Sequence, residues 1–386
     1  MTPPDGRSGS VPLVLLLTAS MGAGHTGVAT ELARRLQARG FQVEVVDLLQ
    51  ILPRPLGRSL RGFYAFMLRW TPWIYEAIYR AWFRPRRGRA APVSPVTWFG
   101  ARAVHKRVSD QEPVAVVSTF HLCSRILGNL RRARRLTAPT ATVIVDFAVH
   151  DLWVDSAVDL HVCLHPRMAR EARQRGAERV TAPGPIVRPC FGDSAWDRQS
   201  ARASLGLSDQ ERAVLIVTGS WGAGDLDTAV DIIGQAGGLT ALVVCGNDER
   251  LRRRLAGRPS CTSGARIMGW VGEMDRLMIA ADVVVENAGG LTCMEALAAG
   301  RPVVSFNPIP GHGRANVEAM VECGIVEHVR RASDLVAAVE AVAGVTPQRA
   351  RRLDAAAEMF RGDAADDILT ALGSSRLASF VAGDHG

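Results

Sequence analysis

Short runs of apolar, often β-branched residues recur along this chain, and amphipathic stretches with helical spacing separate them. A strand inside a parallel sheet has such a continuous apolar run, because helices cover both faces of the sheet. The runs that fit this description lie at residues 11–18, 41–46, 114–119, 141–145, 160–164, 213–218, 239–245, 266–271 and 283–285. Strands that alternate with helices predict an α/β fold with parallel sheets.

The alternation of strands and helices starts twice. Residues 11–46 contain a strand, a glycine loop, an amphipathic helix and a second strand, and the same order begins again at residue 213. Residues 181–189 are rich in proline and glycine, which is typical of a domain hinge. A chain of 386 residues suits two doubly wound α/β domains. The expected divisions are a disordered leader, an N-terminal domain, a C-terminal domain and a tail, at residues 1–10, 11–188, 189–372 and 373–386.

One stretch in the second half, residues 283–304, contains a strand, a glycine turn, a helix and the start of another strand: VVVENAGGLTCMEALAAGRPVV. The turn at residues 287–290 lets the backbone approach a ligand closely and opens a helix at Leu291 or Thr292. Glu295 is the acid of that helix, near its first turn. A loop that leaves a strand and opens a helix is a natural site for an anionic or ribose-bearing ligand.

The first half contains a matching loop, ASMGAGHTG at residues 19–27, before an amphipathic helix expected at residues 28–39. The loop contains the spacing GxGxxG, which alone is a weak sign of a dinucleotide site. It also places His25 at the carboxyl end of a strand, where ligands of doubly wound domains bind. A cleft between two such domains would hold one substrate from each side.

Composition indicates a globular intracellular protein. Apolar residues make up 47% of the chain and charged residues 22%, which excludes a disordered protein. The seven cysteines are scattered and form no CxxC pair, so we expect reduced thiols in a cytoplasmic protein. No apolar run reaches the ~18 residues of a transmembrane helix. We interpret residues 11–19 as a buried strand and not as a signal peptide.

Positive charge is concentrated in the first half of the chain, which has a net formal charge of +14 over residues 1–190, against −6 over residues 191–386. Residues 56–89 contain eight arginines, all three tyrosines and a single acid, Glu76. Arginines and aromatics on helices of moderate hydrophobicity predict a surface that lies on an anionic bilayer. The expected membrane-facing residues are Arg69, Trp70, Trp73, Trp82, Arg84, Arg86 and Arg87. The alternative is a helical pair with a solvated basic face; nucleic acid is not expected, because the segment lacks a nucleic-acid-binding motif.

Six segments, in order, resemble the GT-B glycosyltransferases that act on lipid acceptors. They are SMGAGH at residues 20–25, STFHL at 118–122, VIVDF at 143–147, PGPIVRP at 183–189, ENAGGLTCMEALAAGRPVV at 286–304 and PIPGHGRAN at 308–316. The monogalactosyldiacylglycerol synthases and the bacterial diacylglycerol glucosyltransferases are the most similar, and the peptidoglycan GlcNAc transferase that makes lipid II is a more distant relative. The resemblance extends from Leu13 to Ile325. It implies a GT-B fold, in which two Rossmann-like doubly wound domains face each other across a cleft.

The resemblance implies a UDP-sugar donor bound by the second domain. Glu295 would accept hydrogen bonds from the ribose hydroxyls, and its alternative role is a partner of the helix dipole. Arg188 in the hinge would neutralise the diphosphate, and its alternative role is a solvated charge. The other donor-side residues are Gly219, Ser220, Gly222, Gly289, Gly290, Leu291 and Thr292 at the diphosphate, Gly269, Trp270, Val271 and Met274 at the uracil, and His312 and Asn316 at the sugar.

Transfer of a sugar needs a base that takes the proton of the acceptor hydroxyl. His25 is the leading candidate, because the ordinary pKa of histidine suits this role and the glycine loop would direct it into the cleft. Asp146, at the end of another strand, is the alternative base, in which case His25 would position a substrate. Gly24, His121 and His150 are expected on the acceptor side.

Two metal-like motifs do not predict a metal site. Asp225 and Asp227 begin a helix, where aspartates cap the first turn. The potential ligands of HVCLH, at residues 161–165, alternate along one strand and would rarely converge on one ion. We therefore expect neither a metal nor a cofactor.

These observations predict a transferase that moves a hexose from a UDP-sugar to a lipid acceptor such as diacylglycerol. The resemblance implies inversion at the anomeric carbon. The protein would associate peripherally with an anionic membrane surface, on the inner face of the cell membrane. Two alternatives stay open: a soluble UDP-sugar-dependent transferase that acts on a small molecule, and a non-catalytic membrane-binding protein on a degenerate GT-B scaffold.

Overall fold

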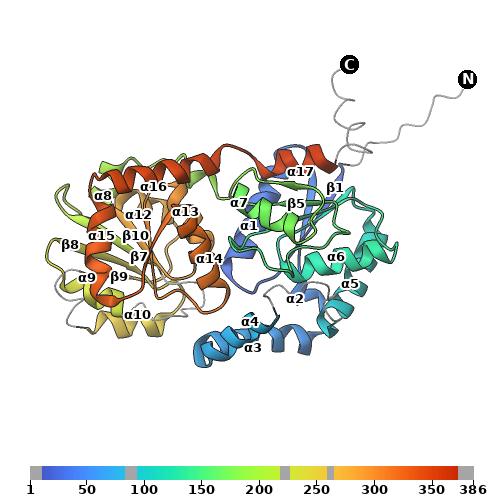
Figure 1. Ribbon diagram of the computed structural model, residues 1–386, viewed down its shortest axis with the longest axis horizontal. Coiled ribbons are helices and arrows are strands. Elements are labelled where there is room, and N and C mark those ends of the chain that lie inside the picture. The colour runs from blue at the N-terminus through green and yellow to red at the C-terminus, as the bar shows by residue number, and fades with distance from the viewer. Residues whose placement is uncertain (1–10, 83–93, 218–226, 259–264, 373–386) are drawn as a thin grey trace, which may run out of the picture.

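The computed structural model describes residues 11–82, 94–217, 227–258 and 265–372. In this part of the chain two domains lie beside each other, and each contains a central sheet with helices on both faces (Figure 1). The described strands of both sheets pair in parallel. The predicted α/β fold with two doubly wound domains is therefore confirmed.

The N-terminal sheet has the strand order β2-β1-β3-β4-β5-β6. Its strands are β1 (Leu13–Thr18), β2 (Gln42–Asp47), β3 (Ala115–Ser118), β4 (Thr140–Val143), β5 (Leu160–Val162) and β6 (Val180–Thr181). The helices of this half are α1 (Ala23–Gln37), α2 (Leu48–Ile51), α3 (Arg54–Trp70), α4 (Pro72–Trp82), α5 (Pro95–Gln111), α6 (His121–Arg132) and α7 (Pro166–Gln174). The apolar residues of the central strands are buried on both faces, which explains their continuous apolar runs.

The C-terminal sheet has the strand order β12-β11-β10-β7-β8-β9. From β7 the chain adds strands on one side of the sheet up to β9, and from β10 it adds them on the other side, so the switch point lies between β7 and β10. Its strands are β7 (Arg212–Val217), β8 (Leu239–Val244), β9 (Ala265–Met268), β10 (Val283–Glu286), β11 (Val303–Phe306) and β12 (Val326–Val329). The α-helices are α8 (Arg198–Ser204), α9 (Asp227–Gln235), α10 (Glu249–Ala256), α12 (Met274–Ala280), α13 (Leu291–Ala298), α14 (His312–Glu322), α15 (Leu335–Ala343), α16 (Pro347–Ala357) and α17 (Ala364–Leu372). Short 3₁₀ turns are η1 (Pro189–Phe191), η2 (Ala332–Asp334) and η3 (Glu358–Phe360).

Each predicted apolar run coincides with a strand, but two boundaries near the site differ from the prediction. The helix expected from residue 28 begins at Ala23, so His25 lies in the first turn of α1 and not in a loop. Its first turn is poor in good helix formers, which is why the sequence pattern places the start too late. The strand expected at residues 266–271 ends at Met268, so Gly269 and Trp270 lie beyond the sheet edge.

The C-terminal helix α17 returns to the N-terminal domain, as Figure 1 shows. Ala364, Ala365 and Ile368 are buried in the cluster that contains Val14 and Leu16 of β1. Arg39, just after the end of α1, also pairs with Asp366 at 2.6 Å. The sequence expectation grouped this helix with the C-terminal domain; its alanine-rich face instead packs against the first sheet.

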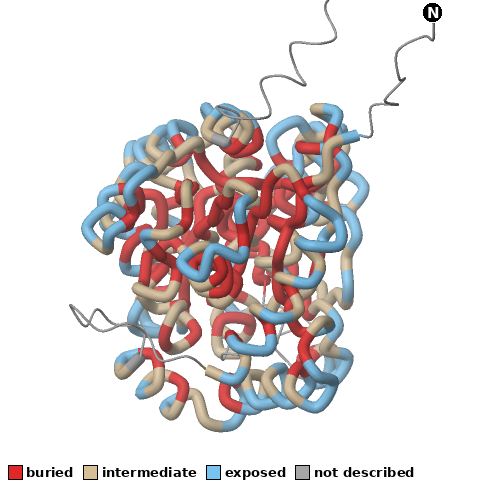
Figure 2. Tube along the Cα trace, turned by 90° about the vertical axis from the view of Figure 1, so that its right-hand side faces the viewer, coloured by how far each residue is buried: buried red, intermediate tan, exposed pale blue. Residues whose placement is uncertain are grey.

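The buried residues gather along the two sheets and the exposed residues on the outer helices (Figure 2). Helices α3 and α4 form a hairpin that lies at one edge of the molecule, below both sheets in the view of Figure 1. Much of this hairpin is exposed, as the predicted amphipathic segment requires. Among the described residues, no helix combines the length and the apolarity that a membrane span needs.

Candidate active site

The N-termini of α1 and α13 meet between the two domains. Both helices follow a strand, β1 and β10, and therefore start at the carboxyl edge of their sheets. A Cβ on Gly27 would lie 2.6 Å from Leu291 Cδ2, and a Cβ on Gly24 would lie 3.8 Å from Leu291 Cβ. The glycines of α1 thus let α13 approach closely, and the two predicted glycine loops face each other.

His25 has a defined proton position in this junction. Its Nδ1 lies 3.0 Å from the backbone carbonyl oxygen of Thr119. Because a carbonyl oxygen only accepts hydrogen bonds, Nδ1 carries the proton and Nε2 keeps its lone pair. Burial lowers the pKa of His25, although the Asp146 carboxylate opposes that shift. The ring packs edge-on against Phe120 at 5.1 Å. His25 is therefore held as a neutral imidazole with a basic nitrogen.

Asp146 follows β4 and is fully engaged by neighbouring side chains. Its Oδ2 accepts the indole N–H of Trp153 at 2.9 Å and lies 3.7 Å from His150 Nε2, while Oδ1 accepts an N–H of Asn316 at 3.2 Å. Burial alone would raise the pKa of Asp146, but His150 beside Oδ2 and the other nearby histidines hold it well below the usual range. A carboxylate with so low a pKa is a weak base. The geometry makes His25 the stronger base of the two.

The two expected acceptor-side histidines lie in the same aromatic cluster. His121 is the first residue of α6, and its ring lies 5.3 Å from that of His150 and 5.6 Å from that of Trp153. Burial lowers the pKa of His121 well below the usual range, and the neighbouring His150 and His25 add to this shift. The structure brings His25, Asp146, His121 and His150 together.

Asn316 does not occupy the position that the sequence suggested. It is 1% exposed, and its side chain bridges the two domains. The side-chain Oδ1 accepts the backbone N–H of Ala148 at 2.8 Å, and Nδ2 donates to Asp146. Asn316, in the second turn of α14, thus contacts the segment that follows β4 across the domain boundary.

The glycine turn after β10 is held by Glu286, a residue that the sequence analysis did not select. Glu286 is 1% exposed, and its Oε2 accepts the N–H groups of Ala288 at 2.7 Å and Gly289 at 2.6 Å. Gly289 has a φ of +61°, which only glycine adopts readily. The Gly289 N–H is therefore committed to Glu286, which corrects its expected role as a diphosphate donor. Gly290, Leu291 and Thr292 remain at the N-terminus of α13, where the first N–H groups of a helix have no partner within the helix.

Glu295 of α13 lies near Arg188 of the hinge. Burial raises the pKa of Glu295 to about 7, and the Arg188 guanidinium opposes this shift. Arg188 itself is exposed and lies over the ring of Phe191, 5.0 Å from its centroid. The half-buried Glu295 carboxyl, with its raised pKa, is suited to contact hydroxyl groups. The exposed Arg188 beside it is suited to contact an anion.

Comparison with known proteins agrees with this geometry. The family profile described as monogalactosyldiacylglycerol (MGDG) synthase matches residues 25–185, and the profile described as glycosyl transferases group 1 matches residues 221–344. A processive diacylglycerol beta-glucosyltransferase of Bacillus thuringiensis is 24% identical over 365 residues, which cover 93% of this chain and 92% of the relative. The chain is a GT-B glycosyltransferase.

Solved structures support the same fold for the glycosyltransferase. The MurG structure of Acinetobacter baumannii aligns with 94% of this chain and 99% of its own, with a TM-score of 0.59 and 15% identity. The structure of UGT89C1 of Arabidopsis thaliana in complex with quercetin covers 94% of this chain and 100% of its own, with a TM-score of 0.62 and 14% identity. At these identities the likeness shows the two-domain architecture.

The glycosyltransferase exposes large aromatic residues on the α3–α4 hairpin. Trp70 is 66% exposed and Trp73 is 71% exposed, and Arg69 lies 5.6 Å from the Trp70 ring. Phe63 and Phe66 are also exposed but were not among the expected membrane-facing residues. Phe63, Phe66 and Trp70 follow one another at spacings of three and four residues, which places them on one side of a helix. This sequence signal would have added the two phenylalanines to the expected residues.

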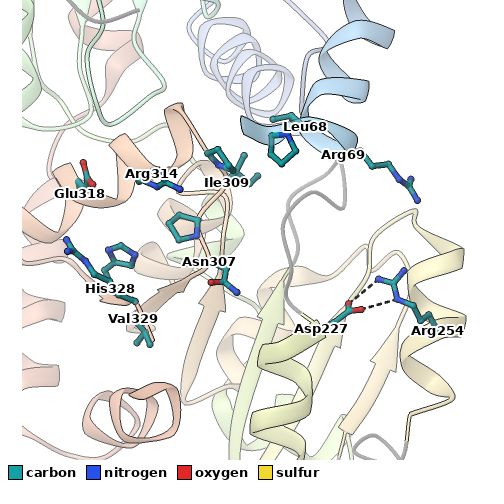
Figure 3. A pocket seen from close by; sticks show the side chains of 14 residues that line it. Leu68, Arg69, Asp227, Arg254, Asn307, Ile309, Arg314, Glu318, His328 and Val329 are labelled. Atoms are coloured by element: carbon teal, nitrogen blue, oxygen red, sulfur yellow. Dashed lines mark hydrogen bonds and ion pairs between the residues drawn. The ribbon is translucent and has the colours of Figure 1, made fainter. Parts of the chain in front are cut away.

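A cavity of about 750 Å³ lies between the end of α3 and the loops that follow β11 and β12 (Figure 3). Leu68 and Arg69 line it from α3, and Asn307 and Arg314 line it from the C-terminal domain. His25, Asp146 and Glu295 are not among its lining residues. This cavity is therefore distinct from the junction of α1 and α13.

Several expected site residues lie outside the described residues. They are Gly219, Ser220, Gly222, Arg84, Arg86, Arg87 and the side chain of Trp82. Of the expected uracil contacts, Trp270 is exposed, and Gly269, Val271 and Met274 are half-buried beyond the end of β9. These four residues therefore lie together at one edge of the C-terminal sheet.

The two metal-like motifs have structural roles. Asp227 pairs with Arg254 at 3.0 Å, whereas Asp225 lies outside the described residues. His161 accepts the N–H of Asp155 at 3.3 Å, and His165 caps the start of α7. Within the described part of the chain, no three His, Cys, Asp or Glu side chains are grouped so as to hold a metal ion.

Proposed function

We propose that this glycosyltransferase moves a hexose from a UDP-sugar to a lipid hydroxyl, such as that of diacylglycerol, at an anionic membrane surface on the cytoplasmic side. The similar proteins named diacylglycerol glucosyltransferase and MGDG synthase support a lipid acceptor. The exposed aromatics of α3 and α4, next to basic residues, support a surface that rests on a bilayer. Neither a metal nor a cofactor enters the proposal.

The observation that carries the proposal is the bond between His25 Nδ1 and the Thr119 carbonyl. It leaves Nε2 as the proton acceptor at the junction of the two glycine loops. In the proposed reaction, Nε2 takes the proton of the acceptor hydroxyl as its oxygen attacks the anomeric carbon. Asp146 then stabilises the imidazolium, as its opposing effect on the His25 pKa indicates. Attack from the face opposite the departing UDP would invert the anomeric carbon.

The donor side of the proposed site uses α13. Glu295 accepts hydrogen bonds from the ribose hydroxyls, and Arg188 with the N–H groups at the start of α13 stabilises the departing diphosphate. The half-buried position of Glu295 and its proximity to Arg188 support this assignment. Trp270 offers a ring on which the uracil can stack, and His312 faces the transferred sugar.

The proposal is tested by incubating the protein with a panel of UDP-sugars and mixed vesicles that contain diacylglycerol, and by identifying the products by mass. We expect a hexosyl lipid as the product. In His25→Ala, turnover should fall by about 10²–10⁴-fold, the usual contribution of a general base, while UDP affinity changes little. His105 makes the same kind of bond to a carbonyl, Arg135 O at 3.0 Å, on the outer surface. His105→Ala is therefore the matched control and should keep full turnover.

Transfer to a soluble alcohol but not to vesicle lipid would replace the lipid acceptor with a small molecule. Near-normal turnover of His25→Ala would remove His25 as the base. Absence of UDP binding would contradict the donor assignment altogether.

A further inference from the structure

Helix α4 of the N-terminal domain holds the start of α14 in the C-terminal domain. Glu76 Oε2 accepts the backbone N–H of Gly311 at 2.6 Å and lies 3.5 Å from Arg314 Nη1. The neighbouring Tyr75 places its hydroxyl 2.9 Å from His312 Nδ1. Two consecutive residues of α4 thus engage three residues of one short segment, 311–314, on the other domain.

This contact is closely fitted. Gly311 has a φ of +75°, and a Cβ at this position would lie 2.7 Å from Tyr75 Cε1. Burial would raise the pKa of Glu76, but the Gly311 N–H and Arg314 lower it below the usual value, so the carboxyl stays ionised. A hydrogen bond from a backbone N–H to an ionised carboxylate is among the stronger kinds. Glu76 therefore fixes where the segment 311–314 lies.

This segment and Ile309, just before it, contact the glycine turn in front of α13. The N–H of Ile309 donates to Asn287 O at 2.9 Å, and a Cβ on Gly289 would lie 3.1 Å from Gly313 O. Ile309 and the turn residue Ala288 also pack with Tyr75 in a small apolar cluster that includes Met67 and Leu68 of α3. The buried face of the hairpin is therefore completed by the C-terminal domain.

The exposed face of the same hairpin carries Trp70 and Trp73, together with Phe63 and Phe66. We propose that Glu76 is a positioning residue that links this exposed face to the glycine turn, so that binding of an anionic bilayer and binding of UDP strengthen each other. The inference rests on the proposed function, which assigns the bilayer to α3–α4 and the diphosphate to the start of α13. Each ligand orders one side of the contact that the other needs, and such coupling is reciprocal.

The test measures UDP affinity by calorimetry with and without vesicles made of equal parts of phosphatidylcholine and phosphatidylglycerol. In the wild type we expect the UDP Kd to fall by about fivefold or more on vesicles, the lower end of common coupling factors. In Glu76→Ala the ratio of the two Kd values should approach one. Tyr75→Phe, which removes only the hydroxyl contact with His312, should lower the ratio in part.

Arg80→Gln is the matched control, because Arg80 lies on the same helix and pairs with the other carboxylate oxygen of Glu76 at 2.7 Å. Its Kd ratio should stay close to that of the wild type. If Glu76→Ala does not fold, Glu76→Gln keeps an acceptor for Gly311, removes the charge that faces Arg314, and should still lower the ratio.

An unchanged ratio in the folded Glu76 variant, or a wild-type ratio of one while both ligands bind, overturns the coupling alone. Loss of UDP binding or of vesicle binding in the wild type overturns the proposed function, and the coupling with it.

Discussion

Asn316 on α14 donates a side-chain N–H to Oδ1 of Asp146 at 3.2 Å, so the C-terminal domain directly contacts the carboxylate beside His25. The same amide accepts the N–H of Ala148 at 2.8 Å. Both hydrogen-bonding groups of Asn316 are therefore used across the domain boundary, in a position that is almost fully buried. This pair of residues therefore joins the domain boundary to the carboxylate that acts on the pKa of His25.

The first prediction concerns Asp146 and the pH dependence of turnover. Asp146 raises the pKa of His25 against the larger effect of burial. In Asp146→Asn this support is lost, so the pKa of His25 falls and the acidic limb of kcat/KM moves to lower pH. Turnover should fall by about tenfold or more, because the imidazolium that forms in the reaction loses the stabilising Asp146 carboxylate. Asp151→Asn is the control: Asp151 lies 3.4 Å from Arg175 and should leave the pH profile unchanged.

The second prediction concerns Glu295 and the pH dependence of UDP binding. Its pKa of about 7 means that the carboxyl of the free protein is largely protonated below that pH. Ribose hydroxyls donate to the ionised form, so binding below pH 7 requires loss of a proton. UDP affinity should rise with pH up to about 7 and then level off. In Glu295→Gln the affinity should be weaker and independent of pH over this range; a wild type without pH dependence would exclude Glu295 as the ribose contact.

The third prediction separates backbone strain from steric clash in the hinge. Gly184 has a φ of +116°, and a Cβ there would lie 1.8 Å from the carbonyl oxygen of Met359. Gly176 has a φ of +96°, but its Cβ would meet nothing within 4 Å. Gly176→Ala should lower the free energy of unfolding by ~1 kcal/mol through the left-handed backbone alone. Gly184→Ala should lower it by more than ~2 kcal/mol, because the hinge must also move away from η3. Chemical denaturation of both variants measures the difference, and equal losses would mean that the hinge yields freely.

The fourth prediction uses two tryptophans that are each 71% exposed but lie on different domains. Trp73 belongs to the α3–α4 hairpin that we propose contacts the membrane, and Trp270 follows β9 at the edge of the C-terminal sheet. Trp73→Ala should weaken flotation with anionic vesicles and leave UDP affinity near that of the wild type. Trp270→Ala should do the reverse, because loss of a stacking ring costs ~1 kcal/mol or more of nucleotide binding. Equal effects of both variants in either assay would contradict the separation of the two surfaces.

The fold was largely predictable from the sequence, because its signals are local. Each buried strand has a continuous apolar run, and the glycine turns and Pro/Gly hinge mark where the chain changes direction. His25 and Glu295 could be selected for the same reason, since His25 lies in a glycine loop at a strand end and Glu295 in the helix that follows such a loop. Helix α17 was assigned to the wrong neighbour, because an alanine-rich amphipathic helix does not specify which of two sheets it covers.

The tertiary structure determined the contacts between segments that lie far apart in the chain. The sequence left His25 and Asp146 as rival bases; burial, the Thr119 carbonyl and the surrounding N–H donors separate their pKa values. The sequence suggested Gly289 and Asn316 as ligand contacts. In the structure, Glu286 accepts the Gly289 N–H and Asp146 accepts a side-chain N–H of Asn316. Hydrogen-bond partners and desolvation depend on positions in space, and residue spacing along the chain does not determine them. The sequence therefore determined the two facing domains and their glycine loops, and only the folded arrangement determined how each polar group near the junction is used.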